Sequence, residues 1–237
     1  MYQETIRNGF QNIGINLTKE QIQAYQMFYE LLIEWNQKMN LTAITEFEDV
    51  LLKHFIDSVA LSRTVELKKI SSVIDVGTGA GFPGIPLKIL YPHLQITLLD
   101  SLNKRIQFLN TVIEKLKLSN IETIHGRAED WGHEIKYREQ YDLCVSRAVA
   151  NLATLSEYCV PFVKAGGLFI AYKAGNVEEE VKEAEHAIRV LHCEKAQTEK
   201  FVLPGGEMSR SFVKIRKKGK LDEKYPRRAG VPGKEPL

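Results

Sequence analysis

Glycines at alternate positions after a short apolar run give the first indication of chemistry. The run from Val73 to Val76 reads as a buried strand that contains Asp75, and glycines stand at positions 77, 79 and 81 directly after it. Because glycine adopts backbone conformations that side chains forbid, this spacing permits a tight turn. Pro83 and Pro86 then mark the first turn of a helix. Strand, turn and helix start together predict bare backbone N–H groups that face a nucleotide-type ligand.

The glycine pattern has two readings. Gly79-x-Gly81-x-x-Gly84 matches the dinucleotide fingerprint, whereas Asp75-x-Gly77-x-Gly79-x-Gly81 has the form found in class I methyltransferases. A dinucleotide fingerprint begins as its strand ends, and Gly79 lies beyond Gly77, which already ends the strand. The spacing favours the methyltransferase form, in which the backbone from Gly77 to Gly81 approaches the methionine part of S-adenosylmethionine. A glycine-rich loop of another α/β protein is the alternative.

Acidic residues follow the next two expected strands. The strand from Ile96 to Leu99 ends in Asp100, just over twenty residues after the glycine turn, where a carboxylate can accept hydrogen bonds from ribose hydroxyls. Its alternative role is to cap the helix expected from Asn103 to Leu118. After the third strand, Ile121 to His125, Ala128 and Glu129 are placed to contact the edge of an adenine, with a plain surface turn as the alternative.

Cations end the strands that follow. Arg147 ends the strand from Leu143 to Ser146, and Lys173 ends the strand from Leu168 to Tyr172. The carboxyl ends of strands form the crevice in which doubly wound sheets bind ligands. We expect Arg147 to serve a ligand site rather than a surface salt bridge, and Lys173 to lie at the same crevice, with the ligand of each cation left open.

The elements that must position these residues alternate between strand and helix from Val73 onward, which predicts a parallel sheet with helices on both faces. The last two strands, around Cys193 to Val202 and Ser211 to Ile215, are joined by a loop from Leu203 to Gly206 that is short enough for an antiparallel hairpin. We also expect a turn at Gly166-Gly167, and helices from Leu152 to Val163 and from Val177 to Leu191.

The first seventy residues are helical in pattern. Capping boxes at Thr18 and at Thr45 start two helices, and the link from Asn40 to Ile44 is a candidate loop facing the pocket. The expected fold class is therefore α/β, a Rossmann-like class I methyltransferase sheet that is mostly parallel with its last strand antiparallel. We divide the chain into an N-terminal helical extension (1–70), an S-adenosylmethionine-dependent methyltransferase domain (71–217) and a basic C-terminal tail (218–237).

Composition excludes several classes of protein. The 237 residues are 44% hydrophobic, yet no apolar run is long enough to span a bilayer and no signal peptide begins the chain, so we expect a cytoplasmic protein. Three scattered cysteines argue for buried thiols and against a disulfide framework or a metal site. From Lys214 to Lys234, nine Lys or Arg face two acids, which indicates either a solvated tail or a nucleic-acid contact.

Several of these stretches belong together in one known family. They are Asn40-Leu41-Thr42-Ala43-Ile44, His54-Phe55-Ile56-Asp57-Ser58, Asp75 to Leu87, Leu99-Asp100-Ser101, Ser146-Arg147-Ala148 and Tyr225-Pro226-Arg227-Arg228-Ala229-Gly230. The set resembles the RsmG family, also called glucose-inhibited division protein B, of bacterial 16S ribosomal RNA methyltransferases. The resemblance covers nearly the entire chain.

The resemblance implies methyl transfer from S-adenosylmethionine to N7 of a guanosine in the decoding-region loop of 16S rRNA. By position it implies that Gly77, Phe82, Ala128, Glu129 and Arg147 bind the cofactor, and that Arg127, Lys173 and Arg210 lie near the substrate. We also expect Thr78, Gly79 and Asp100 at the cofactor, and Asn40 and Phe82 to shape the pocket. The tail, as the family's RNA-binding segment, is expected to lose RNA affinity but no cofactor affinity when Arg227 and Arg228 are neutralised. No obligate protein partner is evident.

Methylation of guanine N7 is consistent with the absence of two motifs of other methyltransferases. Guanine N7 has an in-plane lone pair, so it needs no general base, and the chain has neither the Asn/Asp-Pro-Pro-aromatic tetrad of amino-methylating enzymes nor the Pro-Cys of C5 methylation. Positioning then supplies the catalysis, and Lys173 or Arg147 is expected to contact guanine O6 or a phosphate. Two rival functions remain, an NAD-dependent oxidoreductase that uses Gly79-x-Gly81-x-x-Gly84 with Asp100, and a non-catalytic RNA-binding module.

Overall fold

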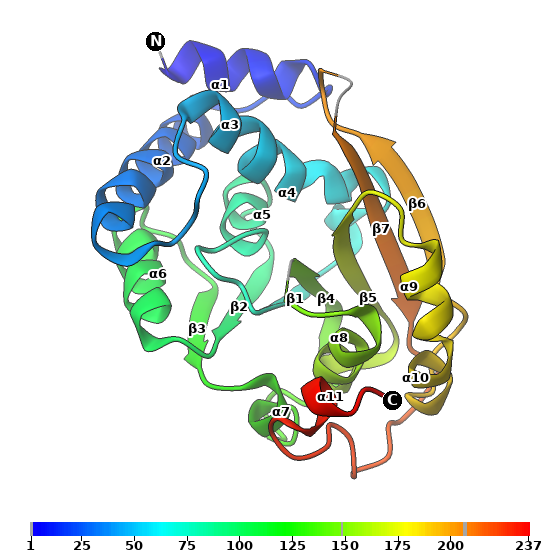
Figure 1. Cartoon of the computed structure of the whole chain (residues 1–237). Coiled ribbons are helices and arrows are strands. Elements are labelled where there is room, and N and C mark those ends of the chain that lie inside the picture. The colour runs from blue at the N-terminus through cyan, green and yellow to red at the C-terminus, as the bar shows by residue number, and fades with distance from the viewer. Residues whose placement is uncertain (1, 148, 206–207) are drawn as a thin grey trace.

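The computed structural model describes residues 2–147, 149–205 and 208–237, and these form a seven-stranded sheet in the order β3-β2-β1-β4-β5-β7-β6 (Figure 1). The strands β1 to β5 are parallel to one another, and β7 runs antiparallel to both β5 and β6. The strand bounds are β1 Ser72–Val76, β2 Gln95–Asp100, β3 Ile121–His125, β4 Tyr141–Arg147, β5 Val163–Ala174, β6 Gln197–Val202 and β7 Ser209–Arg216. The expected class I methyltransferase sheet, with its antiparallel strand near the C-terminal end, is confirmed.

Helices cover both faces of this sheet. The longer helical elements are α1 Tyr2–Gln11, α2 Lys19–Met39, α5 Gly84–Leu90, α6 Asn103–Lys115, α8 Leu152–Cys159, α9 Glu178–Glu183 and α10 Glu185–Val190. The short ones are α3 Phe47–Val50, η1 Leu51–Ile56, α4 Asp57–Val59, η2 Ala60–Arg63, η3 Leu67–Lys69, α7 Ala128–Trp131, η4 Val160–Phe162 and α11 Val231–Lys234.

The alternation of side chains along the strands builds one core on each face. Val73 and Val145 point into a core shared with α1, α2, α5 and α6, whereas Ile74 and Cys144 point into a second core with α8 and α10. Because strand neighbours point to opposite faces, a central strand that is buried on both sides reads as a continuous apolar run. All three cysteines are free and buried, as expected. No helix in the described part of the chain is long and apolar enough to cross a membrane.

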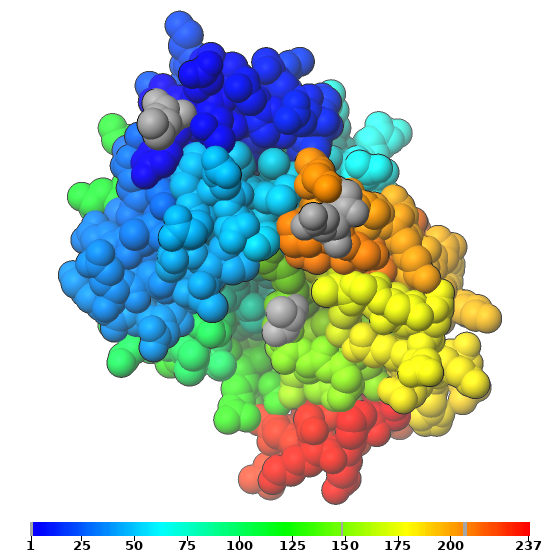
Figure 2. Space-filling model, turned by 45° about the horizontal axis from the view of Figure 1, so that its top comes forward, coloured from blue at the N-terminus to red at the C-terminus, as the bar shows by residue number. Residues whose placement is uncertain are grey.

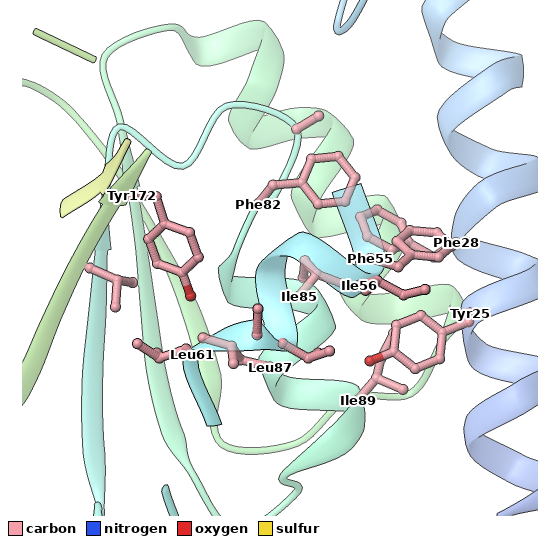
Figure 3. Packing of buried hydrophobic residues seen from close by; sticks show 14 of the residues in the cluster. Tyr25, Phe28, Phe55, Ile56, Leu61, Phe82, Ile85, Leu87, Ile89 and Tyr172 are labelled. Atoms are coloured by element: carbon pink, nitrogen blue, oxygen red, sulfur yellow. The ribbon is translucent and has the colours of Figure 1, made fainter. Parts of the chain in front are cut away.

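Helix α2 attaches the N-terminal helices to the glycine turn. Its predicted capping box is present, because Thr18 Oγ1 accepts from Gln21 N at 3.2 Å and Thr18 N donates to Gln21 Oε1 at 2.9 Å. The hydroxyl of Tyr25 donates to Pro86 O at 2.9 Å, which fixes α2 against α5. Figure 3 shows the aromatic rings of Tyr25 and Phe28 packed toward Phe55 and Phe82 in the same core.

The helix expected after Thr45 differs from the prediction in two ways. Its N-cap is Glu46, without a side-chain hydrogen bond, so the second capping box is wrong. Its middle turn, Leu51–Ile56, is a π-helix, in which the amide of Asp57 donates to Leu52 O, five residues back. Such widened turns gather at functional sites, and this one carries His54 and leads into Asp57.

Three other predicted helices, turns or strands differ from the observed ones. The expected helix from Val177 to Leu191 is interrupted at Ala184, which divides it into α9 and α10. Gly166 and Gly167 lie within β5, which already begins at Val163. The pairing of β5 with β4 shifts in register between Val163 and Leu168, and the two glycines fall in this interval. Near Cys193 the chain makes only an isolated bridge to Lys217, and the strand proper starts at Gln197. The Gly206 end of the expected hairpin loop and Ala148 of the quoted motif lie outside the described residues.

Candidate functional site

Two pockets lie side by side at the carboxyl ends of the strands. The first, which we call the acidic pocket, measures about 280 Å³ and is lined by residues that follow β1, β2 and β3, among them Gly77, Asp100, Arg127, Ala128 and Glu129. The second, the basic pocket, measures about 450 Å³, and its charged lining residues are Lys53, Asp57, Arg147, Lys173 and Arg210. Figure 2 shows the molecule hollowed between the N-terminal helices (blue and cyan), the β6–β7 hairpin (orange) and α9 (yellow).

The glycine turn beside the acidic pocket needs residues without side chains. Gly77 has φ +71°, and a Cβ added to it would lie 2.5 Å from Val149 Cγ2, so a side chain cannot be accommodated. Gly79 has φ +62° and open space where its Cβ would be. The turn therefore presents smooth backbone to a ligand in the pocket.

The amides of the turn are largely engaged within the protein. Gly77 N donates to Leu99 O at 2.8 Å, and Gly79 N donates to Asp100 Oδ2 at 2.9 Å. At the start of α5, Gly84 N donates to Asp75 Oδ2 at 2.9 Å. The expectation of bare N–H groups at these positions is wrong, because a backbone carbonyl and the carboxylates of Asp75 and Asp100 accept them.

Asp75 is buried and accepts hydrogen bonds from residues of the glycine turn. Its Oδ2 also accepts from Thr78 Oγ1 at 2.7 Å, so the hydroxyl of Thr78, a predicted cofactor contact, is committed inside the protein. Oδ1 of Asp75 is buried without a hydrogen-bond partner among the described residues. Burial raises the pKa of Asp75 to about 6.

Asp100 serves the local structure while it lines the acidic pocket. Its Oδ1 accepts from Leu102 N at 2.9 Å, just before α6, and its Oδ2 lies 3.2 Å from Arg105 Nη1. Asp100 is not the predicted N-cap, because Leu102 occupies that position without a side-chain cap, and ribose binding by Asp100, which lines the acidic pocket, stays a prediction. A carboxylate oxygen has two lone pairs, which leaves acceptor capacity for a ligand hydroxyl.

The basic pocket is organised around the carboxylate of Asp57. Asp57 Oδ2 lies 3.0 Å from Arg147 Nη1, and Asp57 Oδ1 lies 3.1 Å from Arg210 Nε. The Asp57 side chain is only 5% exposed, so both ion pairs are shielded from water. Arg147 also donates to Lys53 O at 3.1 Å and lies over the ring of Phe82, 5.2 Å from its centroid.

Lys173 closes the other side of the basic pocket. Its Nζ lies 2.6 Å from Glu180 Oε1 in α9 and donates to Ala150 O at 2.9 Å. Glu180 Oε1 in turn accepts from Leu152 N at the start of α8, so one carboxylate positions the lysine relative to the helix.

His54 lines the same pocket as a neutral ring. It stacks on Phe82 with 4.5 Å between ring centroids, and its Nε2 lies 2.9 Å from Thr42 Oγ1. Burial, together with the nearby charge of Arg147, lowers the pKa of His54 to about 3. Nδ1 of His54 lies 3.2 Å from Arg147 Nη2, which can only donate, and 3.1 Å from Lys53 O, which can only accept.

The structure divides most of the predicted site residues between the two pockets, and Asn40, Thr78, Gly79 and Phe82 line neither. Arg147 and Lys173, whose roles were open, both line the basic pocket together with Arg210. Phe82 packs on the basic side, against His54 and Arg147, although it was expected at the cofactor. Arg127, expected near the substrate, lines the acidic pocket instead.

Asn40 lines neither pocket. It ends α2 in the left-handed conformation, with φ 38°, and Ile44 at the far end of the same loop reaches the basic pocket. Sequence reasoning gave no role to Asp57 or His54, although the stretch His54 to Ser58 was quoted for the resemblance. The available signal was two polar side chains three residues apart, separated by the apolar pair Phe55 and Ile56.

Comparisons with known proteins identify the family of the chain. Residues 21–211 match the family model GidB, described as rRNA small subunit methyltransferase G. A relative from Lachnoclostridium phytofermentans named ribosomal RNA small subunit methyltransferase G is 49% identical, over 98% of this chain and 96% of its own. A relative of the same name from Lysinibacillus sphaericus is 50% identical, over 94% of each chain.

Solved structures share the fold at low identity. An O-methyltransferase from Bacillus cereus in complex with SAH superposes with a TM-score of 0.59 at 15% identity, covering 91% of this chain and 100% of the other. A putative O-methyltransferase from Klebsiella pneumoniae has a TM-score of 0.56 at 13% identity, covering 91% and 99%. Since the family model spans most of the chain and relatives near half identity span almost all of it, the chain belongs to the GidB family of rRNA small subunit methyltransferase G.

Proposed function

We propose that this chain transfers a methyl group from S-adenosylmethionine to N7 of a guanosine in the decoding-region loop of 16S rRNA. The observation that carries the proposal is the basic pocket, which offers cations to RNA but has its candidate bases occupied. Both oxygens of Asp57 accept from guanidinium groups, and His54, with a pKa of about 3, is a very weak proton acceptor. Guanine N7 is a nucleophile that such a site can serve, because its lone pair requires no deprotonation.

The residues of the acidic pocket fit the cofactor. Open space at Gly79 leaves room along the turn, and Gly77 has no side chain to clash with Val149, which lines the same pocket. Asp100 would accept from the ribose hydroxyls, and Ala128 and Glu129 would contact the adenine edge. When bound, S-adenosylmethionine supplies a methyl group activated by a positively charged sulfur.

The basic pocket would hold and orient the guanosine. The guanidinium groups of Arg147 and Arg210 are fixed by Asp57, and Lys173 is fixed by Glu180, so their remaining donors are pre-positioned for O6 of the base or for flanking phosphates. A donor to N7 itself would block the reaction, so O6 and phosphate are the acceptors assigned to these cations. Catalysis is then a matter of alignment and exclusion of water, for which positioned groups can contribute several kcal/mol.

The proposed substrate places the protein in the cytoplasm, with 16S rRNA as its partner. Lys53, Arg147, Lys173 and Arg210 give the pocket a surplus of positive charge over Asp57, which favours a polyanion. The rival NAD-dependent oxidoreductase would need amides free to hold a pyrophosphate, and those of Gly77 and Gly79 are already engaged.

The decisive experiment is to incubate the purified protein with methyl-labelled S-adenosylmethionine and 16S rRNA, as naked RNA and in small subunits, and to map the labelled nucleotide. We expect one labelled guanosine. Borohydride reduction followed by aniline should cleave the RNA chain at this nucleotide, which is the signature of N7 methylation. Label at an exocyclic amine, at C5 of a pyrimidine or at a ribose hydroxyl would contradict the proposal. RNA binding without any transfer would favour the non-catalytic module.

A further inference from the structure

The C-terminal segment from Tyr225 to Glu235, which we call the C-terminal clasp, is docked against the walls of the acidic pocket. Figure 1 shows this segment (red) beside α7 and α8, whose residues line that pocket. His133 Nε2 lies 2.7 Å from Pro226 O just after α7, and Thr154 Oγ1 donates to Pro232 O at 2.9 Å in α8. The sequence predicted a basic tail for RNA, and the structure shows a segment fixed to the protein at several points.

Arg227 is the main anchor of the C-terminal clasp. Its backbone amide donates to Glu157 Oε1 at 2.7 Å, and its Nη2 donates to Glu157 Oε2 at 2.7 Å. Glu157 lies in α8 with a side chain that is 0% exposed. Arg227 therefore neutralises a buried carboxylate, a structural role that the sequence did not indicate.

The C-terminal clasp reaches the acidic pocket through Gly230. The amide of Gly230 donates to Glu129 Oε1 at 2.9 Å, and Gly230 has φ +84°, a conformation that glycine adopts readily. No hydrogen bond among the described residues engages the other oxygen of Glu129, although Glu129 lines the pocket and is only 5% exposed. Gly233 approaches a second pocket residue, because a Cβ added to it would lie 3.4 Å from the hydroxyl of Tyr158.

We propose that the C-terminal clasp positions Glu129 to recognise the 6-amino group of adenine, and that Gly230 is a positioning residue for cofactor binding. This inference rests on the proposed function, which places adenine in the acidic pocket. One oxygen of Glu129 is held by the Gly230 amide, which leaves the other oxygen aligned as an acceptor. A carboxylate fixed in this way loses little conformational freedom when it binds the amino group.

The test compares the full chain with a variant truncated after Arg228, which keeps the Arg227–Glu157 pair but lacks Gly230. Titration calorimetry with S-adenosylhomocysteine gives the dissociation constant of each. We expect truncation to raise Kd about tenfold, the size expected for the loss of one hydrogen bond to a charged group. In a Glu129→Ala background the same truncation should change Kd by less than about twofold, because the residue through which it acts is gone.

Two further measurements separate positioning from loss of structure. An S-adenosylhomocysteine analogue without the 6-amino group should bind the full and truncated chains equally. Thr154→Val in the full chain removes the hydroxyl that holds Pro232 and should raise Kd for S-adenosylhomocysteine even if the truncated chain fails to fold, whereas Lys234→Ala, at an exposed position of α11, should not. Equal weakening for both ligands, or an unchanged Kd in the truncated chain and in Thr154→Val, would overturn the inference. A full chain that binds no S-adenosylhomocysteine would instead refute the proposed function.

Discussion

Asp57 binds Arg147 across the junction between the N-terminal helices and the sheet, with 3.0 Å between Asp57 Oδ2 and Arg147 Nη1. The two residues are far apart in sequence, and the aspartate begins α4 directly after a π-helical turn. Its second oxygen binds Arg210 in β7. One carboxylate from the N-terminal helices therefore sets the position of two guanidinium groups on the sheet.

Asp57→Asn tests this arrangement with little change of volume. Without the charge, the two guanidinium groups lose their common anchor, and we expect kcat/KM for 16S rRNA to fall by about tenfold or more. Calorimetry should give an unchanged Kd for S-adenosylhomocysteine, because Asp57 does not line the acidic pocket. Glu66→Gln, which breaks only the exposed pair with Lys69 outside both pockets, is the control and should retain full turnover. Normal turnover in Asp57→Asn would remove the residue from the site.

Lys173→Ala should weaken RNA binding more than cofactor binding. The lysine lines the basic pocket, where the proposed function places the RNA, and its side chain is 14% exposed. We expect the slope of log Kd for RNA against log salt to decrease in magnitude by about one, as for the loss of one phosphate contact. Lys200→Ala, which removes a surface cation paired with Glu178, should leave the slope unchanged. Identical slopes for wild type and Lys173→Ala would show that this cation contacts no phosphate.

Arg227→Ala is expected to destabilise the whole protein. It leaves Glu157 buried and unpaired, which costs about 3–5 kcal/mol in comparable cases. Urea denaturation should show this loss, whereas the neighbouring exposed Arg228→Ala should change the unfolding free energy by about 0.5 kcal/mol or less. If both variants were equally stable and only RNA affinity fell, the C-terminal segment would be an RNA-binding tail after all.

The stability of the protein should depend on pH through His54. Burial lowers its pKa from 6.5 to about 3, so below pH 6.5 the unfolded chain binds a proton that the folded chain does not. Stability supplied by the neutral ring is thus present above pH 6.5 and is lost as the pH falls toward 3, by about 1.4 kcal/mol per pH unit.

Asp75 acts in the opposite direction. Its pKa is raised to about 6, so the folded chain takes up a proton before the unfolded chain does, and this stabilising contribution is lost as the pH rises through 6. We therefore compare His54→Gln with wild type, so that the Asp75 contribution cancels. The difference in unfolding free energy between the two proteins should shrink steadily from pH 6.5 to pH 4. A difference that does not vary with pH would show that His54 is protonated in the folded state.

The parts of the fold that sequence could predict are those set by local pattern. Apolar alternation and glycine spacing located β1 and the turn, and the cap at Thr18 placed the start of α2, because these signals act over a few residues. Charged residues at strand ends, such as Asp100 and Arg147, could be assigned to the carboxyl edge because the parallel topology brings all those ends together.

The missing parts are those that depend on distant partners. Asp57 meets Arg210 only when the N-terminal helices pack on the last strands, and no local signal encodes that contact. The π-helical turn before Asp57 is a rare geometry that apolar periodicity reads as an ordinary helix. Arg227 looked like a free cation because its buried partner, Glu157, lies in another helix.

The engaged amides of the glycine turn have one more consequence, which concerns the choice among adenine-containing molecules. Gly77, Gly79 and Gly84 donate inward, so this helix start offers little to compensate a polyphosphate, and the acids behind it repel one. ATP and NAD should therefore compete poorly for the proposed adenosine site, and the protein should keep its affinity for S-adenosylmethionine, which carries no phosphate, in their presence.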